Sequence, residues 1–303
     1  MLLLRTFVER ASSELPDLEL RTAEPLCEHT SFRIGGNAAV MVFPKSEREL
    51  CACRKILFEL NTDPLILGAG TNVLAPDEGL ERVVICLKGA LCGIRMTGET
   101  QFEACAGETL ARAALFARDH GLAGLEFAHG IPGTVGGGVY MNAGAYGGEL
   151  KQVVTCVTVM DPTGELRDVS CAGDTFGYRT SIFEDRDGVI VKATFSLKPG
   201  DPETIGRTMR ELMERRKASQ PLELPSAGST FKRPANGYAA ALIDEAGLKG
   251  ARVGGAAVSE KHAGFVVNLG GATSADVKAL MRRVQDTVEK NTGVRLEPEV
   301  RIW

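Results

Sequence analysis

The most informative segment of the chain reads Gly130-Ile-Pro-Gly-Thr-Val-Gly-Gly-Gly-Val-Tyr-Met-Asn-Ala-Gly-Ala-Tyr-Gly-Gly-Glu149. Eight of its twenty residues are glycine, which loses more backbone entropy on folding than any other residue. The segments on both sides have the apolar pattern of a hydrophobic core. Ordering so many glycines between them costs much conformational entropy, which indicates a function for the segment. Glycine-rich backbone can wrap an extended ligand with its amide groups. No Gly-Lys-Ser or Gly-Lys-Thr occurs here, which excludes a nucleoside-triphosphate P-loop. The segment predicts a ligand cradle, with a purely structural loop as the alternative.

A second glycine turn lies upstream, in Pro64-Leu-Ile-Leu-Gly-Ala-Gly-Thr-Asn-Val-Leu74. A buried strand leads into the Gly-Ala-Gly turn, whose amides, together with the Thr and Asn that follow, can form a nest for phosphate oxygens. A dinucleotide-binding fingerprint needs a third glycine and a helix straight after the strand. Val73 stands at that glycine position and Pro76 follows soon, so no helix is expected. A plain tight turn remains the alternative.

Composition narrows the class of protein. The chain has 303 residues, of which 44% are hydrophobic and 24% charged, a balance typical of globular proteins. Its net charge of −4 implies no general affinity for nucleic acid or other polyanions, so an anionic ligand needs a local basic pocket. The eight cysteines include no Cys-x-x-Cys pair, and the four histidines form no close ligand pairs. We therefore expect reduced thiols and no metal site.

Targeting signals are not expected. Met1-Leu-Leu-Leu-Arg5 is too short an apolar run for a signal peptide. No apolar stretch reaches about 18 residues, so no membrane span is expected. The sequence predicts a cytoplasmic protein that acts as a monomer.

Periodicity predicts an α+β fold of three segments, 1–90, 91–199 and 200–303. Ser46-x-x-Glu49 is a capping box, Asp201 and Ser274 are predicted N-caps, and Gly121 is a predicted helix end. The patterns predict helices over 1–15, 46–60, 108–120, 202–217 and 274–290, and strands over 39–43, 64–67, 83–87, 101–106, 153–160, 189–197 and 294–303.

Three further segments contain polar residues. Each segment, taken alone, would be interpreted as ordinary solvent-exposed surface. They are Gly177-Tyr-Arg-Thr-Ser181, Pro225-Ser-Ala-Gly-Ser-Thr-Phe-Lys-Arg-Pro234 and Leu296-Glu-Pro-Glu-Val300. Ser229 lacks the Gly-x-Ser-x-Gly elbow of hydrolases. An arginine in a polar loop and a glutamate beside a terminal strand are usually solvated. Only the occurrence of these segments together indicates a functional site.

Six segments together resemble the UDP-N-acetylenolpyruvoylglucosamine reductase (MurB) family. In chain order they are His29-Thr-Ser-Phe-Arg-Ile-Gly-Gly36, Leu67-Gly-Ala-Gly-Thr-Asn-Val-Leu74, Gly130-Ile-Pro-Gly-Thr-Val-Gly-Gly137, Tyr178-Arg-Thr-Ser181, Ala227-Gly-Ser-Thr-Phe-Lys232 and Glu297-Pro-Glu-Val300. The resemblance covers nearly the whole chain. The connection between Arg179 and Ser229 is short, as in the family branch that lacks an extra substrate-closing loop. The tyrosine that such a loop supplies to the diphosphate is therefore not assigned here.

The resemblance implies an FAD-binding domain of two subdomains, 1–90 and 91–199, of the PCMH or vanillyl-alcohol-oxidase type. It implies a C-terminal α+β substrate domain, 200–303, whose last strand returns a catalytic glutamate. The implied reaction belongs to peptidoglycan precursor synthesis. NADPH is the co-substrate, FAD is bound non-covalently, and UDP-N-acetylglucosamine enolpyruvate is reduced to UDP-N-acetylmuramate.

The family's roles carry over to residues that match its segments. Arg179 and Glu299 would meet the negative charge that hydride addition builds on the substrate carboxylate. Ser229 would be the general acid, and Lys232 could stabilise its oxyanion. The expected cofactor-binding residues are Gly68, Ala69, Gly70, Thr71, Asn72, Gly130, Ile131, Gly133, Thr134, Gly136, Gly137 and Asn142. The expected substrate-binding residues are Tyr140, Lys232, Arg233, Lys249 and His262, with a packing role as the alternative for Tyr140.

Two other functions remain open at this level. One is an FAD-dependent oxidase of a sugar or alcohol, which would turn over with oxygen rather than NADPH. The other is a non-catalytic module that binds flavin or a nucleotide sugar.

Overall fold

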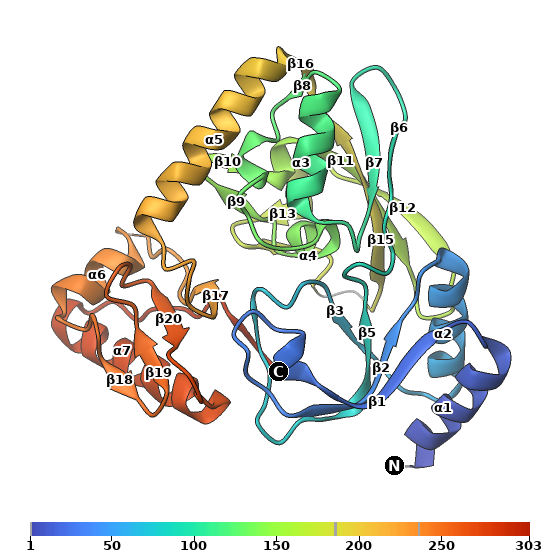
Figure 1. Ribbon diagram of the computed structural model, residues 1–303, viewed down its shortest axis with the longest axis horizontal. Helices are drawn as coiled ribbons and strands as arrows, with labels where there is room; N and C mark the ends of the chain where they lie inside the picture. Colours follow the sequence, from blue (N-terminus) through green and yellow to red (C-terminus); the bar gives the residue numbers. More distant parts are fainter. Residues whose placement is uncertain (1, 185–186, 236) are drawn as a thin grey trace. The chain divides into compact units, whose positions relative to one another are not determined.

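The computed structural model describes residues 2–184, 187–235 and 237–303, and these form two compact units (Figure 1). The first unit comprises the described residues of Met1–Ala23, Ala39–Ala69 and Glu81–Glu214. The second comprises Glu24–Ala38, Gly70–Leu80 and the described residues of Arg215–Trp303. Each unit has a large hydrophobic core of its own.

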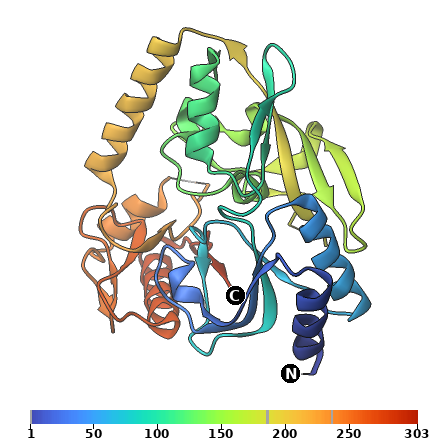
Figure 2. The same cartoon turned by 45° about the vertical axis from the view of Figure 1, so that its right-hand side comes forward.

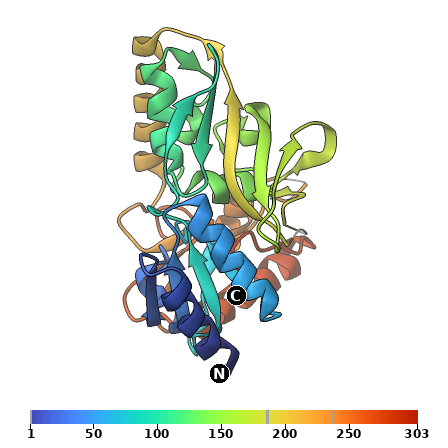
Figure 3. The ribbon, with the colours of Figure 1, turned by 90° about the vertical axis from the view of Figure 1, so that its right-hand side faces the viewer.

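The first sheet of the first unit has the strand order β1-β2-β5-β3. Helices α1 (Leu2–Glu14) and α2 (Glu47–Glu59) lie side by side next to this sheet (Figure 3). Ser46 caps α2 as predicted, since its hydroxyl accepts from the Glu49 amide at 3.2 Å. The second bond of the predicted capping box, from the Ser46 amide to the Glu49 carboxylate, is wrong. The Glu49 carboxylate accepts from the Lys45 amide instead. The strands are β1 (Glu19–Pro25), β2 (Asn37–Phe43), β3 (Leu65–Leu67) and β5 (Leu80–Cys86).

The second sheet of the first unit is antiparallel, with the order β12-β11-β15-β7-β6. Phe102 and Phe195 stack across it with ring centroids 4.9 Å apart. Helix α3 (Leu110–Asp119) ends before Gly121, whose φ of +66° makes it the predicted left-handed terminator. Asp201 caps α5 (Pro202–Ser219) as predicted, by accepting from the Thr204 amide at 2.9 Å. The strands are β6 (Ile94–Met96), β7 (Gln101–Cys105), β11 (Val154–Met160), β12 (Leu166–Ser170) and β15 (Val189–Ser196).

Short paired elements complete the first unit. They are β8 (Leu122–Ala123) with β16 (Lys198–Pro199), β9 (Gly144–Ala145) with β10 (Gly148–Glu149), and β13 (Phe176–Gly177) with β14 (Thr180–Ser181).

The second unit packs α6 (Ala239–Glu245) and α7 (Ser274–Thr292) with a four-stranded sheet of order β17-β20-β19-β18 (Figure 2). The apolar residues that repeat along one face of α7 are all buried and form its core stripe; they are Val277, Leu280, Met281, Val284 and Val288. The N-cap is Thr273 rather than Ser274, since the Thr273 hydroxyl accepts from the Asp276 amide and Asp276 reaches back. The strands are β17 (Ser226–Ser229), β18 (Arg252–Val253), β19 (Ala256–Val258) and β20 (Phe265–Asn268).

The C-terminal tail differs from the predicted strand over 294–303. Only β21 (Arg301–Ile302) is a strand, and it pairs in parallel with β4 (Val73–Leu74). Pro298 has no N–H to donate and forms only an isolated bridge with Phe231. The tail therefore contacts two different segments in turn, which a continuous strand in one sheet could not do.

The α+β class is confirmed. The three sheets of four or five strands fall within 19–86, 94–196 and 226–268. The domain limits at residues 90 and 199 stay a prediction. Among the described residues, no helix combines the length and the apolar character needed to cross a membrane.

The start of α7 depends on an acidic side chain from a distant part of the sequence. The two carboxylate oxygens of Asp77 accept from the Ser274 amide at 2.7 Å and the Ala275 amide at 3.0 Å. These amides belong to the first turn of α7, where no carbonyl of the helix itself can accept from them. Asp77 thus fastens the loop after β4 to the longest helix of the second unit.

Replacing Asp77 by alanine should lower the free energy of unfolding by about 1–2 kcal/mol, because two helix-terminal amides lose their acceptor. Urea unfolding followed by far-UV circular dichroism measures the change. Glu78→Ala is the matched control, since Glu78 is exposed beside it. Equal midpoints for the two variants would contradict the role given to Asp77.

Candidate functional site

Two segments predicted to form a cradle approach each other within the first unit. Gly68 lies against Thr134 so closely that a Cβ on Gly68 would stand 2.5 Å from the Thr134 Oγ1. Thr134 is buried, and its hydroxyl accepts from the Gly137 amide at 3.3 Å. Side chains larger than hydrogen therefore do not fit at residue 68 without displacing this cap. The glycine turn and the glycine-rich segment are thus neighbours, as one ligand site requires.

The glycine-rich segment contains a helix that was not predicted, α4 (Val135–Tyr140). Thr134 is its N-cap, and a Cβ on Gly136 would lie 2.9 Å from the Ala106 Cβ. A Cβ on Gly138 would lie 3.0 Å from the side chains of Leu110 and Leu150. Close packing around a short helix thus explains part of the glycine content. The alternative of a structural loop accounts for these positions.

Asn142 is fully buried, with a φ of +43°. Its Nδ2 donates to the Glu149 carboxylate and to the Gly177 carbonyl, both at 2.8 Å. Its Oδ1 accepts from the Lys151 amide at 3.0 Å. These bonds hold the end of the glycine-rich segment to the next hairpin. A contact between the Asn142 side chain and a cofactor stays a prediction, and the observed bonds oppose it.

Arg179 lies in the two-residue turn of the hairpin formed by β13 and β14, with a φ of +56°. Its guanidinium donates to the Gly144 carbonyl at 3.0 Å. Ser181, on β14, donates its hydroxyl to the Tyr140 carbonyl at 2.7 Å. Together with the bond from Asn142, these contacts fix Arg179 beside the glycine-rich segment. Tyr140 is half-buried and its side chain packs against the core of the first unit, in line with the packing alternative.

Ser229 ends β17 in the second unit. Between Ser226 opposite Val267 and Ser229 opposite Phe265, strand β17 has one more residue than its partner, which is a β-bulge. Gly228, inside the bulge, has a φ of +75°. Ser229 is exposed, whereas the next residue is buried. Ser229 is therefore an exposed serine that directly follows the bulge and precedes a buried residue.

Glu299 lies beside Ser229 because their segments pair. The Glu299 amide donates to the Thr230 carbonyl and the Lys232 amide donates to the Glu297 carbonyl, at 2.9 and 2.8 Å. Thr230 is 1% exposed, and its hydroxyl accepts from the Val266 amide at 2.9 Å. The structure thus brings together the two predicted catalytic residues of the second unit, which stand 70 positions apart in the sequence.

Two polar residues near these segments received no role from the sequence. Ser31 donates its amide to the Gly70 carbonyl at 3.0 Å and its hydroxyl to the Ser226 carbonyl at 2.6 Å. Thr230 is the second, with the contacts given above. Ser31 lies in the segment His29–Gly36 that contributes to the family resemblance, which is the only sequence signal for it.

The predicted substrate-binding cations already have partners within the second unit. The Lys232 ammonium pairs with the Glu297 carboxylate, and the Lys249 ammonium pairs with Asp244 at 2.6 Å. The Arg233 guanidinium lies 4.1 Å from the centre of the Tyr238 ring and donates to a nearby backbone carbonyl. Substrate would have to compete with these partners. The contact of Lys232 with the Ser229 oxyanion stays a prediction.

His262 differs from the other expected substrate residues in its charge. Burial lowers the pKa of its imidazole, and the nearby Lys249 ammonium acts in the same direction. The ring is thus neutral at pH 7, and its Nδ1 accepts from the Gly264 amide at 3.2 Å. His262 is thus suited to a hydrogen bond with a ligand.

The cysteines are free thiols. Burial raises the pKa of Cys53 to about 12 and that of Cys86 to about 11, so both are protonated and unreactive at neutral pH. These two fit the predicted core thiols, whereas Cys92 is exposed.

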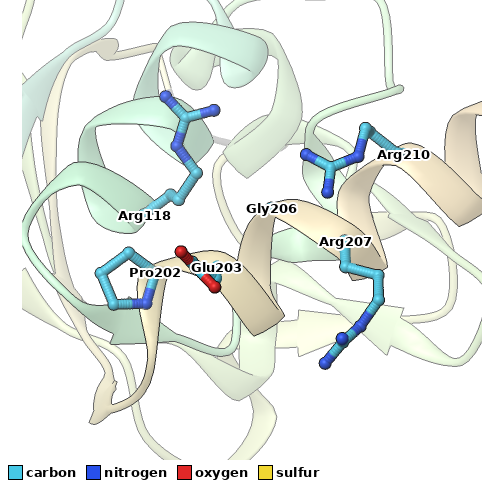
Figure 4. Close-up of a pocket in the computed structure, with 6 residues that line it drawn as sticks. All are labelled: Arg118, Pro202, Glu203, Gly206, Arg207 and Arg210. Carbon is cyan, nitrogen blue, oxygen red and sulfur yellow. The ribbon is translucent and has the colours of Figure 1, made fainter.

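A cavity of about 440 Å³ lies between α3 and α5 in the first unit (Figure 4). Arg118 forms an ion pair with Asp119 at 2.6 Å, and Arg207 donates to the Thr204 hydroxyl at 3.1 Å. Two of its three guanidinium groups thus have partners, and no residue predicted for the site lines it. The cavity is not the predicted cradle. Its lining residues are Arg118, Pro202, Glu203, Gly206, Arg207 and Arg210.

Comparison with known proteins gives full-length matches. Residues 220–303 match the family described as UDP-N-acetylenolpyruvoylglucosamine reductase, C-terminal domain, and residues 38–170 match an FAD binding domain. The UDP-N-acetylenolpyruvoylglucosamine reductase of Streptococcus pyogenes serotype M18 (strain MGAS8232) is 43% identical over 290 residues, covering 96% of this chain and 98% of the relative. That of serotype M1 is 42% identical over the same lengths.

A solved structure agrees with these matches. The crystal structure of UDP-N-acetylenolpyruvylglucosamine reductase (MurB) from Thermus caldophilus is similar with a TM-score of 0.81 and 35% identity, covering 94% of this chain and 98% of that chain. The predicted fold, an FAD-binding part followed by a C-terminal α+β part, is confirmed by these findings.

Gly68→Ala tests the cradle in the first unit. The added methyl group would collide with the Thr134 hydroxyl, so the purified protein should retain less flavin and bind FAD at least tenfold more weakly, about 1.4 kcal/mol or more. Fluorescence titration of the flavin-free protein with FAD measures the affinity. Gly98→Ala is the control, because a Cβ there meets only ordinary contacts with Gln101. Unchanged affinity in Gly68→Ala would exclude this turn from the flavin site.

Proposed function

Because the chain belongs to the UDP-N-acetylenolpyruvoylglucosamine reductase family, we propose that it reduces the enolpyruvyl ether of UDP-N-acetylglucosamine to the lactyl ether of UDP-N-acetylmuramate. It is an FAD-dependent oxidoreductase of peptidoglycan synthesis that uses NADPH. The observation that carries the proposal is the match to curated reductases over nearly the full length of both chains. We further propose that the enzyme acts as a monomer in the cytoplasm.

The residues present fit a flavin nucleotide. Gly68 and Gly70 approach Thr134 and His29 so closely that a Cβ at either position would collide, so only glycine lets the turn follow this path. We assign FAD to the turn 68–72 and to the segment 130–137, with backbone amides as donors to the diphosphate. Bound FAD supplies hydride transfer between NADPH and the substrate.

The residues of the chain must stabilise the negative charge that develops on the substrate and must supply a proton to it. Hydride addition at the terminal methylene carbon builds negative charge onto the substrate carboxylate, and donors that meet this charge lower the barrier. We assign this role to Arg179 and Glu299, the residues that match the family's segments. Glu299 must donate a hydrogen bond to do so, which requires its carboxyl to hold or share a proton when the charged substrate is bound.

Ser229 is assigned as the general acid that protonates the carbon bearing the carboxylate. Its position at the end of β17, exposed and preceded by the Gly228 bulge, supports a hydroxyl that reaches a ligand. A free hydroxyl is a weak acid, so the serine oxyanion needs a neighbouring cation or donor. Lys232, three residues along the same segment, is our candidate, and it would have to leave Glu297.

The expected outcome for the whole reaction is NADPH oxidation that depends on UDP-N-acetylglucosamine enolpyruvate, measured at 340 nm with the flavin-loaded protein. Oxygen consumption on a sugar or alcohol without NADPH would favour the oxidase instead. Bound flavin with no substrate-dependent oxidation would indicate a binding module.

Ser229→Ala should leave flavin reduction by NADPH near normal and slow flavin reoxidation by the substrate roughly 100-fold to 10,000-fold, the range that general acid catalysis contributes. Stopped-flow flavin absorbance separates the two half-reactions. Ser226→Ala, on the same strand, is the control and should behave as the native protein. A collapse of flavin reduction in Ser229→Ala would mean that its role is misassigned.

A further inference from the structure

We infer that Asn72 is a positioning residue for Glu299, linking the turn assigned to the flavin with the segment that carries the proposed catalytic carboxyl. The inference rests on the proposed function. It gives Asn72 a role beyond the cofactor contact that the sequence suggested.

Asn72 contacts the C-terminal segment through both its side chain and its backbone. Its Nδ2 donates to the Glu299 carbonyl at 3.1 Å. Its own carbonyl accepts from the Arg301 amide at 2.9 Å. Directly after it, Val73 and Arg301 are paired in the parallel register of β4 and β21. Asn72 therefore lies beside Glu299 at the point where the terminal strand begins.

The main chain of Glu299 is held from two sides. Its amide donates to the Thr230 carbonyl, next to Ser229, and its carbonyl accepts from Asn72. Thr230 is itself fixed, because its amide donates to the Gly264 carbonyl at 2.8 Å and its hydroxyl is also bonded. The Glu299 amide is therefore bonded to the Thr230 carbonyl, and the Glu299 carbonyl to the side-chain amide of Asn72.

The strand side cannot set the position of Glu299 alone. Pro298 precedes it and has no N–H, and the strand pairing resumes only at Arg301. Without the Asn72 amide, the Glu299 carbonyl loses the hydrogen bond that ties it to the turn at residue 72. A hydrogen bond of this kind contributes only about 1 kcal/mol to stability. A catalytic group displaced by about 1 Å can nevertheless cost roughly 100-fold in rate.

Asn72 also has a second Nδ2 hydrogen and lies in the turn assigned to the flavin diphosphate. The same residue can thus donate to the cofactor while holding Glu299. Loss of Asn72 should consequently affect the step that uses Glu299 more than the step in which NADPH reduces the flavin.

The test uses Asn72→Asp in the full-length, FAD-saturated enzyme. Aspartate keeps the shape and the Oδ1 acceptor but removes the donor to the Glu299 carbonyl. We expect reoxidation of the reduced flavin by the substrate to slow about 100-fold, a larger loss than any in flavin reduction by NADPH, which Asn72 affects only through its contact with the cofactor. Asn72→Ala should give the same pattern, and Asn291→Ala, exposed on α7, should leave both rates unchanged.

A double-mutant cycle with Glu299→Gln decides whether the effect passes through Glu299. If it does, Asn72→Asp slows reoxidation by less than about threefold in the Glu299→Gln background. An equal slowing in both backgrounds would overturn the inference, as would a parallel loss of flavin reduction. Native reoxidation in Glu299→Gln alone would instead refute the proposed role of Glu299, and the positioning role with it.

Discussion

The second unit depends on a short backbone pairing between two segments that are distant in the sequence. The Glu299 amide on the Thr230 carbonyl and the Lys232 amide on the Glu297 carbonyl join the end of β17 to the C-terminal tail. Backbone pairing fixes register, so it sets Glu299 opposite Thr230, the residue next to Ser229. The bulge at Gly228 then exposes the serine while its neighbour stays buried.

The first unit depends on a different constraint, which is the close approach of glycine backbone to neighbouring residues. Gly68 against Thr134, and Gly136 against Ala106, leave no space for a Cβ. Buried polar side chains then hold the glycine-rich backbone in place. Asn142 does so through its hydrogen bonds to Glu149 and Gly177. Because the Asn142 side chain is fully buried, the loss of these bonds would leave a polar group unsatisfied. The hairpin that carries Arg179 is held in this way.

Local signals predicted the elements whose causes are local. The hydroxyl of Ser46, the carboxylate of Asp201 and the positive φ of Gly121 act within a few residues of the helix ends that they define. Helix α4 was missed because its glycines argue against a helix, whereas the close packing of Gly136 on Ala106 and of Gly138 on Leu110 explains them. The predicted terminal strand was wrong for a similar reason, since its apolar pattern says nothing about which partners it meets.

The sequence by itself determined the family, the fold class and the residues to examine, because six short segments in a fixed order are specific even when each is weak. Only the tertiary structure decided which of these segments lie together. It paired Glu299 with Thr230, bonded Asn72 to Glu299, and committed the Asn142 side chain to the protein. Glu299 and Thr230 stand 69 positions apart and Asn72 and Glu299 stand 227 apart, so their hydrogen bonds depend on how the chain folds back on itself, and no local pattern encodes that register.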